Sequence, residues 1–153
     1  MSSSEDLRIG HGILDAHHEA MLARISELRQ SVEAKDAGGA VAALAALWDE
    51  TVIHFATEDS LMEEHLYPER SAHRRAHHLF VEDLKALIRE AKEHGVSSEV
   101  AEWALERLPG WVKFHIQAND APLAQFVARK TAARIIAAVG GAQPQKPGRS
   151  DAS

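Results

Sequence analysis

Histidines recur in this sequence at spacings that let two side chains meet on one side of a helix. His73 and His77 are four residues apart, and so are His54 and Glu58. Residues four apart on an α-helix lie about 40° apart around the axis and about 6 Å along it, so their side chains can aim at one point. Imidazole nitrogens that share an aim with a carboxylate are typical of a metal site.

The same histidines fall on apolar stripes rather than on polar faces. His18 follows Leu14 by one helical turn, His54 continues a line from Leu47, and His115 lies in the aromatic stretch WVKFHI. A lone histidine on an apolar face is more often a hydrogen-bonded core residue than a ligand. Here four helices each contribute inward imidazoles, and burying several ionisable groups in one small core is unfavourable unless something pairs with them. A metal cluster supplies that pairing.

The number of candidate ligands favours two ions over one. Imidazole suits zinc, copper, iron or nickel, and a zinc ion takes four ligands. Seven candidates exceed the needs of one ion, which indicates two ions that share carboxylates as bridges. The residues alone leave the metal open. The candidates are His18, His54, Glu58, His73, His77, His115 and Asp120.

The composition narrows the class of protein. The 153 residues include ten histidines and no cysteine, which excludes disulfides, thiolate metal sites and cysteine nucleophiles and fits a reducing compartment. A formal net charge of −6 gives no nucleic-acid footprint. The opening MSSSEDLRIG lacks the features of a signal peptide, and no apolar run approaches membrane-spanning length. We therefore expect a cytoplasmic protein with neither a nucleic-acid nor a membrane partner.

The elements that must position these residues are helices, because Ala and Leu dominate at helical spacing and strand signals are nearly absent. We predict helices over residues 13–34, 40–65 and 68–94, with a break at 36–39 and Gly95 as a stop. A fourth helix starts after Ser97 or Ser98. Short connections favour an all-α fold, an antiparallel up-down-up-down four-helix bundle.

The fourth helix is predicted to be irregular. Pro109 and Gly110 should kink it, and Pro122 should end or kink it again. Asp120 is five residues after His115, which is about 140° of rotation in a straight helix, so a shared aim needs a bulge or an unwound turn. A short C-terminal helical extension over 123–139 should complete a domain at 1–139, and a disordered tail should follow over 140–153.

The full set of motifs resembles the hemerythrin family, most closely its single-domain bacterial members, over about residues 9–130. The opening ILDAHH is similar to the family's I-D-x-Q-H segment, with His17 in place of the glutamine. The motifs that carry the resemblance are His18, HFATE ending at Glu58, HRRAH from His73 to His77, and WVKFHIQAND ending at Asp120.

The resemblance implies a cofactor of two non-haem irons. Three imidazoles would hold one iron and two the other: His73, His77 and His115, then His18 and His54. Glu58 and Asp120 would bridge the two irons, with an oxo or hydroxo group as a third bridge. The second iron is then one ligand short, and dioxygen would bind at that position.

The function implied is reversible dioxygen binding for transport, storage or delivery, not catalysis. Oxygen-activating di-iron bundles use four carboxylates with paired Glu-x-x-His motifs, and this chain has no such pair at its centre. Phe55, Val112 and Ile116 are candidates to line a dry pocket around the ligand. Three alternatives stay open: an oxygen or redox sensor acting through a partner, a di-iron enzyme handling peroxide or NO, and a structural zinc bundle. We expect a monomer, since no large apolar stripe is left over after the bundle is packed.

The remaining histidines are expected at the surface or beside the ligands rather than among them. Asp15 and Glu50 are candidates to accept hydrogen bonds from ligand imidazoles. The five histidines are His11, His17, His65, His78 and His94.

Overall fold

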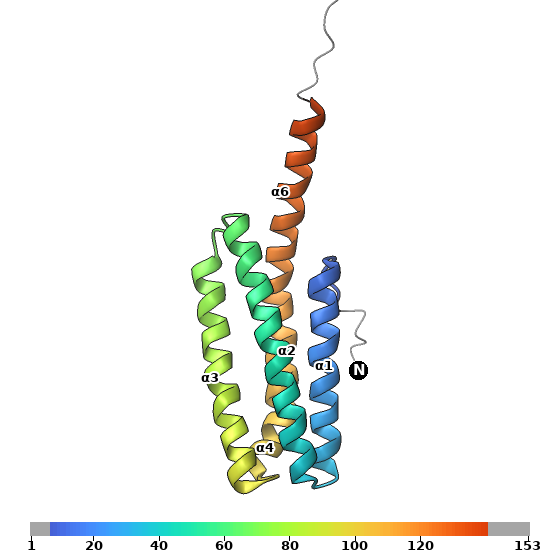
Figure 1. Ribbon diagram of the computed structural model, residues 1–153, viewed down its shortest axis with the longest axis vertical. Helices are drawn as coiled ribbons and strands as arrows, with labels where there is room; N and C mark the ends of the chain where they lie inside the picture. Colours follow the sequence, from blue (N-terminus) through green and yellow to red (C-terminus); the bar gives the residue numbers. More distant parts are fainter. Residues whose placement is uncertain (1–6, 141–153) are drawn as a thin grey trace, which may run out of the picture.

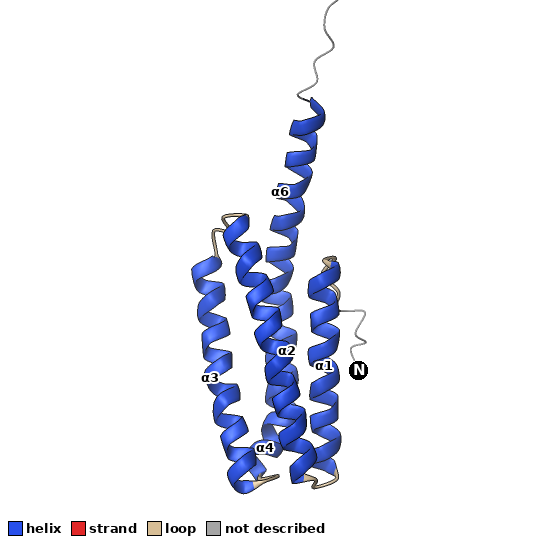
Figure 2. Ribbon diagram, viewed as in Figure 1, coloured by secondary structure: helices blue, strands red, loops and turns tan. Residues whose placement is uncertain are grey.

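Helices make up almost all of the described chain, and no strand occurs within residues 7–140, the part that this computed structural model describes (Figures 1 and 2). The first three helices are α1 (Gly12–Glu33), α2 (Ala37–Glu64) and α3 (Arg70–His94). The fourth arm of the bundle is a series of consecutive helical segments. They are α4 (Ser98–Glu102), η2 (Trp103–Arg107), α5 (Leu108–His115), η3 (Ile116–Asp120) and α6 (Ala121–Gly140).

The four arms run up, down, up and down, as predicted. α1 packs on α2 and α2 on α3, while the fourth arm packs on α1 and α3. The connections are a few residues long, which forces neighbours to be antiparallel. The all-α, antiparallel four-helix bundle predicted from the sequence is therefore confirmed.

Most helix ends follow the expected chemistry. Gly95 ends α3 with φ of 66°, a backbone conformation that disfavours any side chain with a Cβ. Ser97 caps α4, because its side chain accepts a hydrogen bond from the amide of Val100. The third helix begins at Arg70 instead of residue 68, since a turn over 67–69 precedes it.

The predicted break at 36–39 was wrong. The chain reverses earlier, at Lys35 with φ of 54°, and Asp36 caps α2 by accepting a hydrogen bond from the amide of Gly39 at 2.9 Å. Residues 37–39 therefore form the first turn of α2. An aspartate cap at the right place outweighs the low helix propensity of two adjacent glycines.

Two π-helical turns explain how the fourth arm accommodates its prolines. In η2 the amide of Leu108 bonds to the carbonyl of Trp103, and in η3 the amide of Ala121 bonds to the carbonyl of Ile116. Each turn is followed by a proline as the second residue of the next α-helical segment, Pro109 or Pro122 in turn. A proline ring clashes with the carbonyl four residues before it in a regular α-helix, and the wider turn relieves that clash.

The expected irregularity is thus confirmed, but the helix does not end at Pro122. It continues without interruption into α6, which gives the predicted C-terminal extension. Gly140, assigned to the tail by the sequence, is the last residue of α6; residues 141–153 lie outside the described part. The domain boundary at 139 stays a prediction.

Buried apolar side chains from all four arms form one main core, and a smaller cluster lies beside it. The main core includes Leu28, Leu44, Phe80, Leu84 and Leu108. The smaller cluster consists of Met62, Tyr67, Leu123 and Val127. Beyond Val127, α6 extends past the ends of the other helices, and its residues 128–140 are all exposed (Figure 1).

α2 is long and apolar enough to cross a membrane by length and composition alone, so the sequence-based expectation on this point needs correction. However, α2 packs between α1 and α3 and buries the polar residues Thr51, His54 and Glu58. Buried polar groups facing other helices are typical of a core helix. The helix is therefore consistent with a soluble bundle.

Candidate metal centre

Seven ionisable side chains meet in the interior of the bundle, and they are the seven candidates named from the sequence. None is more than 6% exposed. α1 contributes one imidazole, α2 an imidazole and a carboxylate, α3 two imidazoles, and the fourth arm an imidazole and a carboxylate. In order they are His18, His54, Glu58, His73, His77, His115 and Asp120.

These side chains fall into two groups that share the two carboxylates. Within each group one ligand atom from every residue lies within 4.8 Å of every other. The larger group consists of His73, His77, His115, Glu58 and Asp120. The smaller group consists of His18, His54, Glu58 and Asp120.

Asp120 divides its two carboxylate oxygens between the groups. Its Oδ1 lies 3.1 Å from Nε2 of His73 and 3.0 Å from Nε2 of His115. Its Oδ2 lies 2.9 Å from Nε2 of His18 and 3.4 Å from Nε2 of His54. A carboxylate with one oxygen turned to each group has the geometry of a bridge between two ions.

Glu58 divides its oxygens in the same way. Its Oε2 lies 2.9 Å from Nε2 of His77 and 3.2 Å from Nε2 of His73. Its Oε1 lies 3.6 Å from Nε2 of His54, in the smaller group. Two carboxylates therefore span the same pair of groups, from α2 and from the fourth arm.

The π-helical turn η3 is what brings Asp120 to this position. Asp120 is five residues after His115, and one added residue in the turn lets a five-residue spacing replace the usual four. The bulge required by the sequence argument is therefore present, and Asp120 is inside the helix rather than beyond its end.

Several of the buried polar atoms are not satisfied by each other. Oε1 of Glu58 and Oδ1 of Asp120 have no hydrogen-bond partner with suitable geometry among the described residues, although ring nitrogens lie close to both. Nε2 of His77 lies 3.1 Å from Nε2 of His115, two nitrogens that repel if both are protonated. Acceptor atoms that converge on common points in a dry interior cannot satisfy one another, whereas a cation bound between them can.

Burial makes it unfavourable for the side chains of the cluster to carry charge without an ion. Burial raises the pKa of Glu58 well above its usual value. Burial also opposes ionisation of Asp120, but the imidazoles of His115 and His18 hold its pKa well below the usual range. The two carboxylates are therefore unequal without an ion, and a bound cation would favour the charged form of both.

The two imidazoles of α3 are also unequal. Burial opposes protonation of His73, but its contacts with Asp120 and Glu58 raise its pKa to about 9. Burial, with the neighbouring rings of His73 and His115, lowers the pKa of His77 to about 2. Without an ion, His73 is therefore the ring of the pair that carries a proton, and a cation bound at its Nε2 would take the place of that proton.

Aromatic rings fix two of the candidate ligands. Trp111 stacks on His115 with ring centroids 4.5 Å apart and planes 10° apart, and Phe80 stacks on the same indole with centroids 3.9 Å apart. Phe55 stacks on His77 with centroids 3.7 Å apart. Trp111 also packs against the main core, and its contact with a candidate ligand was not predicted from the sequence.

Asn119 is a second contact that the sequence argument missed. Its side-chain amide nitrogen lies 3.0 Å from Nδ1 of His115. If Nε2 of His115 binds a cation, Nδ1 carries the ring proton. Rotation of the Asn119 side-chain amide by 180° then turns its oxygen to Nδ1, where it can accept a hydrogen bond from the N–H. The four-residue spacing of His115 and Asn119 was the available signal.

The other two polar candidates beside the ligands are paired elsewhere. Asp15 accepts a hydrogen bond from the backbone amide of Ile9 at 2.8 Å, and Glu50 lies 3.9 Å from Nε of Arg24. The hypothesis that these acids bond to ligand imidazoles therefore gains no support from the structure.

Four of the five remaining histidines lie where the sequence places them, and one does not. His78 and His94 are exposed, and His11 caps α1 by accepting a hydrogen bond from the amide of Leu14. His17 is half-buried, with its ring edge-on to His54 at 5.6 Å. His65 is only 7% exposed, so its expected surface position was wrong; it bonds to the carbonyl of Leu61 at the end of α2.

The residues predicted to line a dry pocket belong to the core or pack against it. Val112 and Ile116 are buried in the main core, one on each side of His115 in the sequence, and Phe55 packs against the same core. Their role in facing a bound ligand stays a prediction.

Comparisons with known proteins agree with the geometry. Residues 10–127 match the model of the hemerythrin HHE cation binding domain. The chain is 30% identical to a bacteriohemerythrin of Pseudomonas aeruginosa over 121 residues, which cover 76% of this chain and 74% of that one. It is 28% identical to a bacteriohemerythrin of Ralstonia nicotianae over 129 residues, 83% of this chain and 88% of that one. A third relative, from Stenotrophomonas maltophilia, is 26% identical over 80% of this chain and 78% of its own.

Proposed function

The chain belongs to the hemerythrin family, and from that premise we propose that it holds two non-haem iron ions and binds dioxygen reversibly. The observation that carries the proposal is the asymmetry of the centre. Three imidazoles meet two carboxylates in one group, and two imidazoles meet the same carboxylates in the other. One ion would then have five protein ligands and the other four, which leaves a position for an external ligand.

The residue roles follow from the division of carboxylate oxygens. His73, His77 and His115 would hold one iron, and His18 and His54 the other. Glu58 and Asp120 would bridge them, since each turns one oxygen to each group. The bound pair of irons would supply the reversible binding of dioxygen.

The protein's own residues would hold the centre in place and keep it dry. Stacking of Trp111 on His115 and of Phe55 on His77 limits the rotation of two ligand rings. The buried side chains of Val112 and Ile116 would exclude water from the interior around His115. Asn119 would hold the proton on Nδ1 of His115 and so keep Nε2 free to bind.

A carrier or store is favoured over an enzyme by the ligand set. Five imidazoles and two carboxylates place less anionic charge on the ions than the four carboxylates of oxygen-activating bundles. We therefore propose binding without catalytic turnover, by a cytoplasmic monomer that meets dioxygen in solution.

Substitution of one ligand in the smaller group tests the proposal. His54→Ala should lose the iron of that group and, with it, dioxygen binding. The control variant His78→Ala changes an exposed histidine outside the cluster and should keep both. Iron content and the visible spectrum under nitrogen and under air give the readout. Unchanged oxygen binding in folded His54→Ala protein would refute the assignment.

A further inference from the structure

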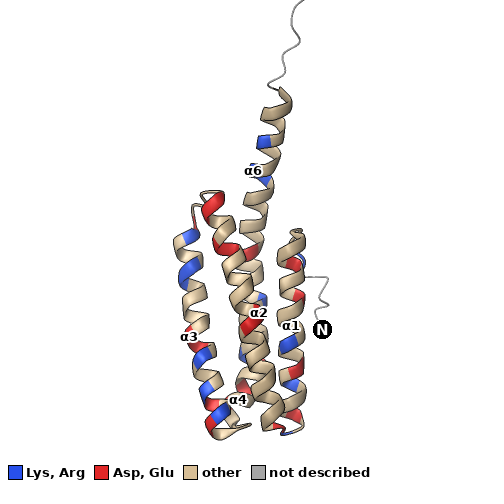
Figure 3. Cartoon of the chain, viewed as in Figure 1, with Lys and Arg blue, Asp and Glu red and all other residues tan. Residues whose placement is uncertain are grey.

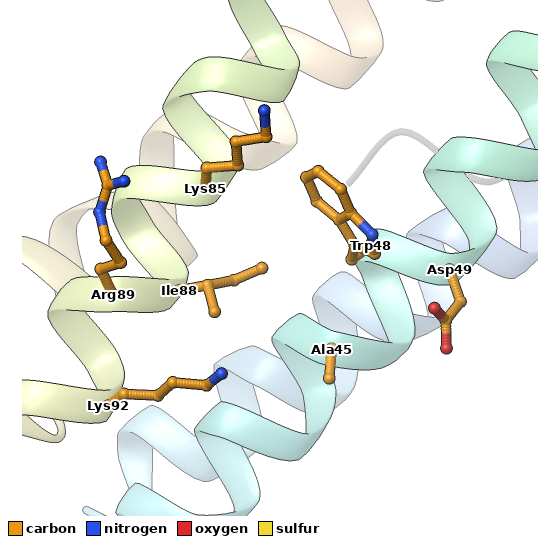
Figure 4. Close-up of a pocket in the computed structure, with 7 residues that line it drawn as sticks. All are labelled: Ala45, Trp48, Asp49, Lys85, Ile88, Arg89 and Lys92. Carbon is orange, nitrogen blue, oxygen red and sulfur yellow. The ribbon is translucent and has the colours of Figure 1, made fainter.

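A groove on the outer surface between α2 and α3 has the features of a second, unrelated binding site (Figure 4). It has a volume of about 380 Å³ and shares no residue with the metal centre. It is lined from α2 by Ala45, Trp48 and Asp49 and from α3 by Lys85, Ile88, Arg89 and Lys92.

The walls of the groove are apolar and held in place. The indole of Trp48 and the side chain of Ile88 face each other across it (Figure 4). Both side chains are partly buried and pack against the main core on their inner sides. A flat apolar group can therefore enter between them without displacing core residues, and the indole gives it a ring to stack on.

The rim of the groove is cationic. Lys85, Arg89 and Lys92 are spaced by four and three residues, which places them on one face of α3. Asp49 is the single acid among the lining residues, so three cations oppose one carboxylate in a chain whose formal net charge is −6. Figure 3 shows blue Lys and Arg segments, together with red Asp and Glu segments, along the lower half of α3.

Lys85 is paired with an acid on its own helix but remains available to a ligand. Lys85 pairs with Glu82 at 3.1 Å, one turn away on the same helix, and both side chains are about half exposed. Ion pairs at such exposed positions contribute little, so an anion in the groove can replace Glu82. In Figure 4 the ammonium of Lys92 extends across the groove toward Ala45.

We propose that this groove binds a small aromatic anion, a planar ring system that carries a carboxylate, sulfonate or phosphate. The ring lies between Trp48 and Ile88, the anionic group is held by Lys92, whose ammonium extends across the groove, and Arg89 adds positive charge at the rim. Charge complementarity and an aromatic wall identify the ligand class. The proposal goes beyond oxygen binding and does not depend on iron.

The dimensions favour a small molecule over an acidic protein. The cations span seven residues of helix, about 10 Å. A stable protein interface buries roughly 800 Å² on each partner, far more than seven residues provide. Ligand pockets fall at about 300–1,000 Å³, the range into which the groove falls.

The test uses a matched pair of dyes with the iron-loaded full chain. 1-Anilinonaphthalene-8-sulfonate carries the proposed ring and anion, and N-phenyl-1-naphthylamine has the same rings without the sulfonate. We expect the anionic dye to bind once per chain and at least about tenfold more tightly than the neutral dye. Dye emission and the shift of the Trp48 indole proton in an NMR spectrum report binding.

Variants locate the binding. Arg89→Gln combined with Lys92→Gln should weaken the anionic dye by about tenfold, the effect that two exposed ion pairs supply together, and should leave the neutral dye unchanged. Arg29→Gln combined with Arg134→Gln removes the same charge from exposed positions outside the groove and should change neither dye. Unchanged iron content and circular dichroism verify that the variants are folded.

Three results would overturn the proposal. The first is no binding of the anionic dye, or equal binding of both dyes. The second is binding that survives the groove variants but is lost when the exposed Ile135 and Ile136 of α6 are changed to serine. The third is poly-L-glutamate binding more tightly than the dye with the same dependence on Arg89 and Lys92, which would make the groove a docking site for acidic proteins.

Discussion

At the scale of single residues, the centre depends on which atom of each side chain turns inward. All five imidazoles present Nε2 to the cluster, and both carboxylates present one oxygen to each group. The larger group therefore has three imidazoles and the smaller group two, whereas both groups share the same two carboxylates. The inequality leads to a different expectation for each group.

Loss of a ligand from the smaller group should leave the larger one intact. In His18→Ala the larger group keeps three imidazoles and both carboxylates, so we predict that iron falls from two ions per chain to one. Iron analysis after gel filtration measures the ratio, and His78→Ala is the control because His78 is exposed beside a candidate ligand. Two irons in folded His18→Ala protein would contradict the assignment of His18.

Asn119 offers a test of how the ligand rings are held. Asn119→Ala removes the partner of Nδ1 on His115, and such a loss typically lowers metal affinity about 10- to 100-fold. Gln117→Ala, an exposed change in the same π-helical turn, is the matched control. Competition with a chromogenic chelator measures both affinities; equal values for the two variants would mean that Asn119 has no role in holding the ring.

Helical periodicity predicted six of the seven members of the cluster, because it places the pairs His54–Glu58 and His73–His77 each on one face and puts His18 and His115 on apolar stripes. Asp120, five residues after His115, does not follow from regular helical spacing. Contacts between side chains of different helices could not be predicted in this way. The stacking of Trp111 on His115 depends on rotamers, and the burial of His65 depends on how the end of α2 packs. Neither is fixed by spacing within one helix.

At the scale of elements, the two π-helical turns are the feature that the sequence could only partly predict. Pro109 and Pro122 indicated irregular helix, and the spacing from His115 to Asp120 required a bulge. The sequence did not show that a wide turn precedes each proline and keeps the helix continuous. That outcome depends on packing of the fourth arm against α1 and α3, which outweighs the local preference to break.

Two glycines should respond to the same substitution with opposite signs. Gly95 has φ of 66° and its added Cβ would meet Cβ of Ala37 at 3.3 Å, so Gly95→Ala should destabilise by about 1–2 kcal/mol. Gly110 is helical with open space where a Cβ would stand, so Gly110→Ala should stabilise by about 0.5–1 kcal/mol. Urea unfolding of the apo-proteins measures both. Equal effects would show that the backbone at Gly95 is not left-handed.

At the scale of the whole molecule, the exposed end of α6 bears on the oligomeric state of the protein. The expectation of a monomer rested on the absence of a leftover apolar stripe. Beyond the bundle, however, Ile135, Ile136 and Val139 of α6 are 59%, 70% and 73% exposed. The reason given for a monomer was therefore wrong, and the monomer itself stays a prediction, to be checked by sedimentation at several concentrations.

Metal removal should weaken the whole fold, because bound ions would compensate seven buried ionisable groups. Binding at a thousand times the dissociation constant stabilises by about 4 kcal/mol, so removal should lower Tm on the order of 10 °C. Scanning calorimetry before and after chelation measures the shift, and adding iron back should restore it. In His73→Ala the shift should shrink, whereas in His78→Ala it should remain. A Tm that is unaffected by chelation would mean that the cluster needs no metal.

Reversible oxygen binding by two irons can be tested on the full chain by combining an iron assay with spectroscopy. Iron is assayed anaerobically, and the visible spectrum is recorded before oxygen is added, after it is added and after it is removed. We predict two irons per chain and a protein that is colourless when reduced, coloured under oxygen and colourless again once oxygen is withdrawn. Two irons that oxidise at once without a reversible band, or zinc in place of iron, would contradict the account.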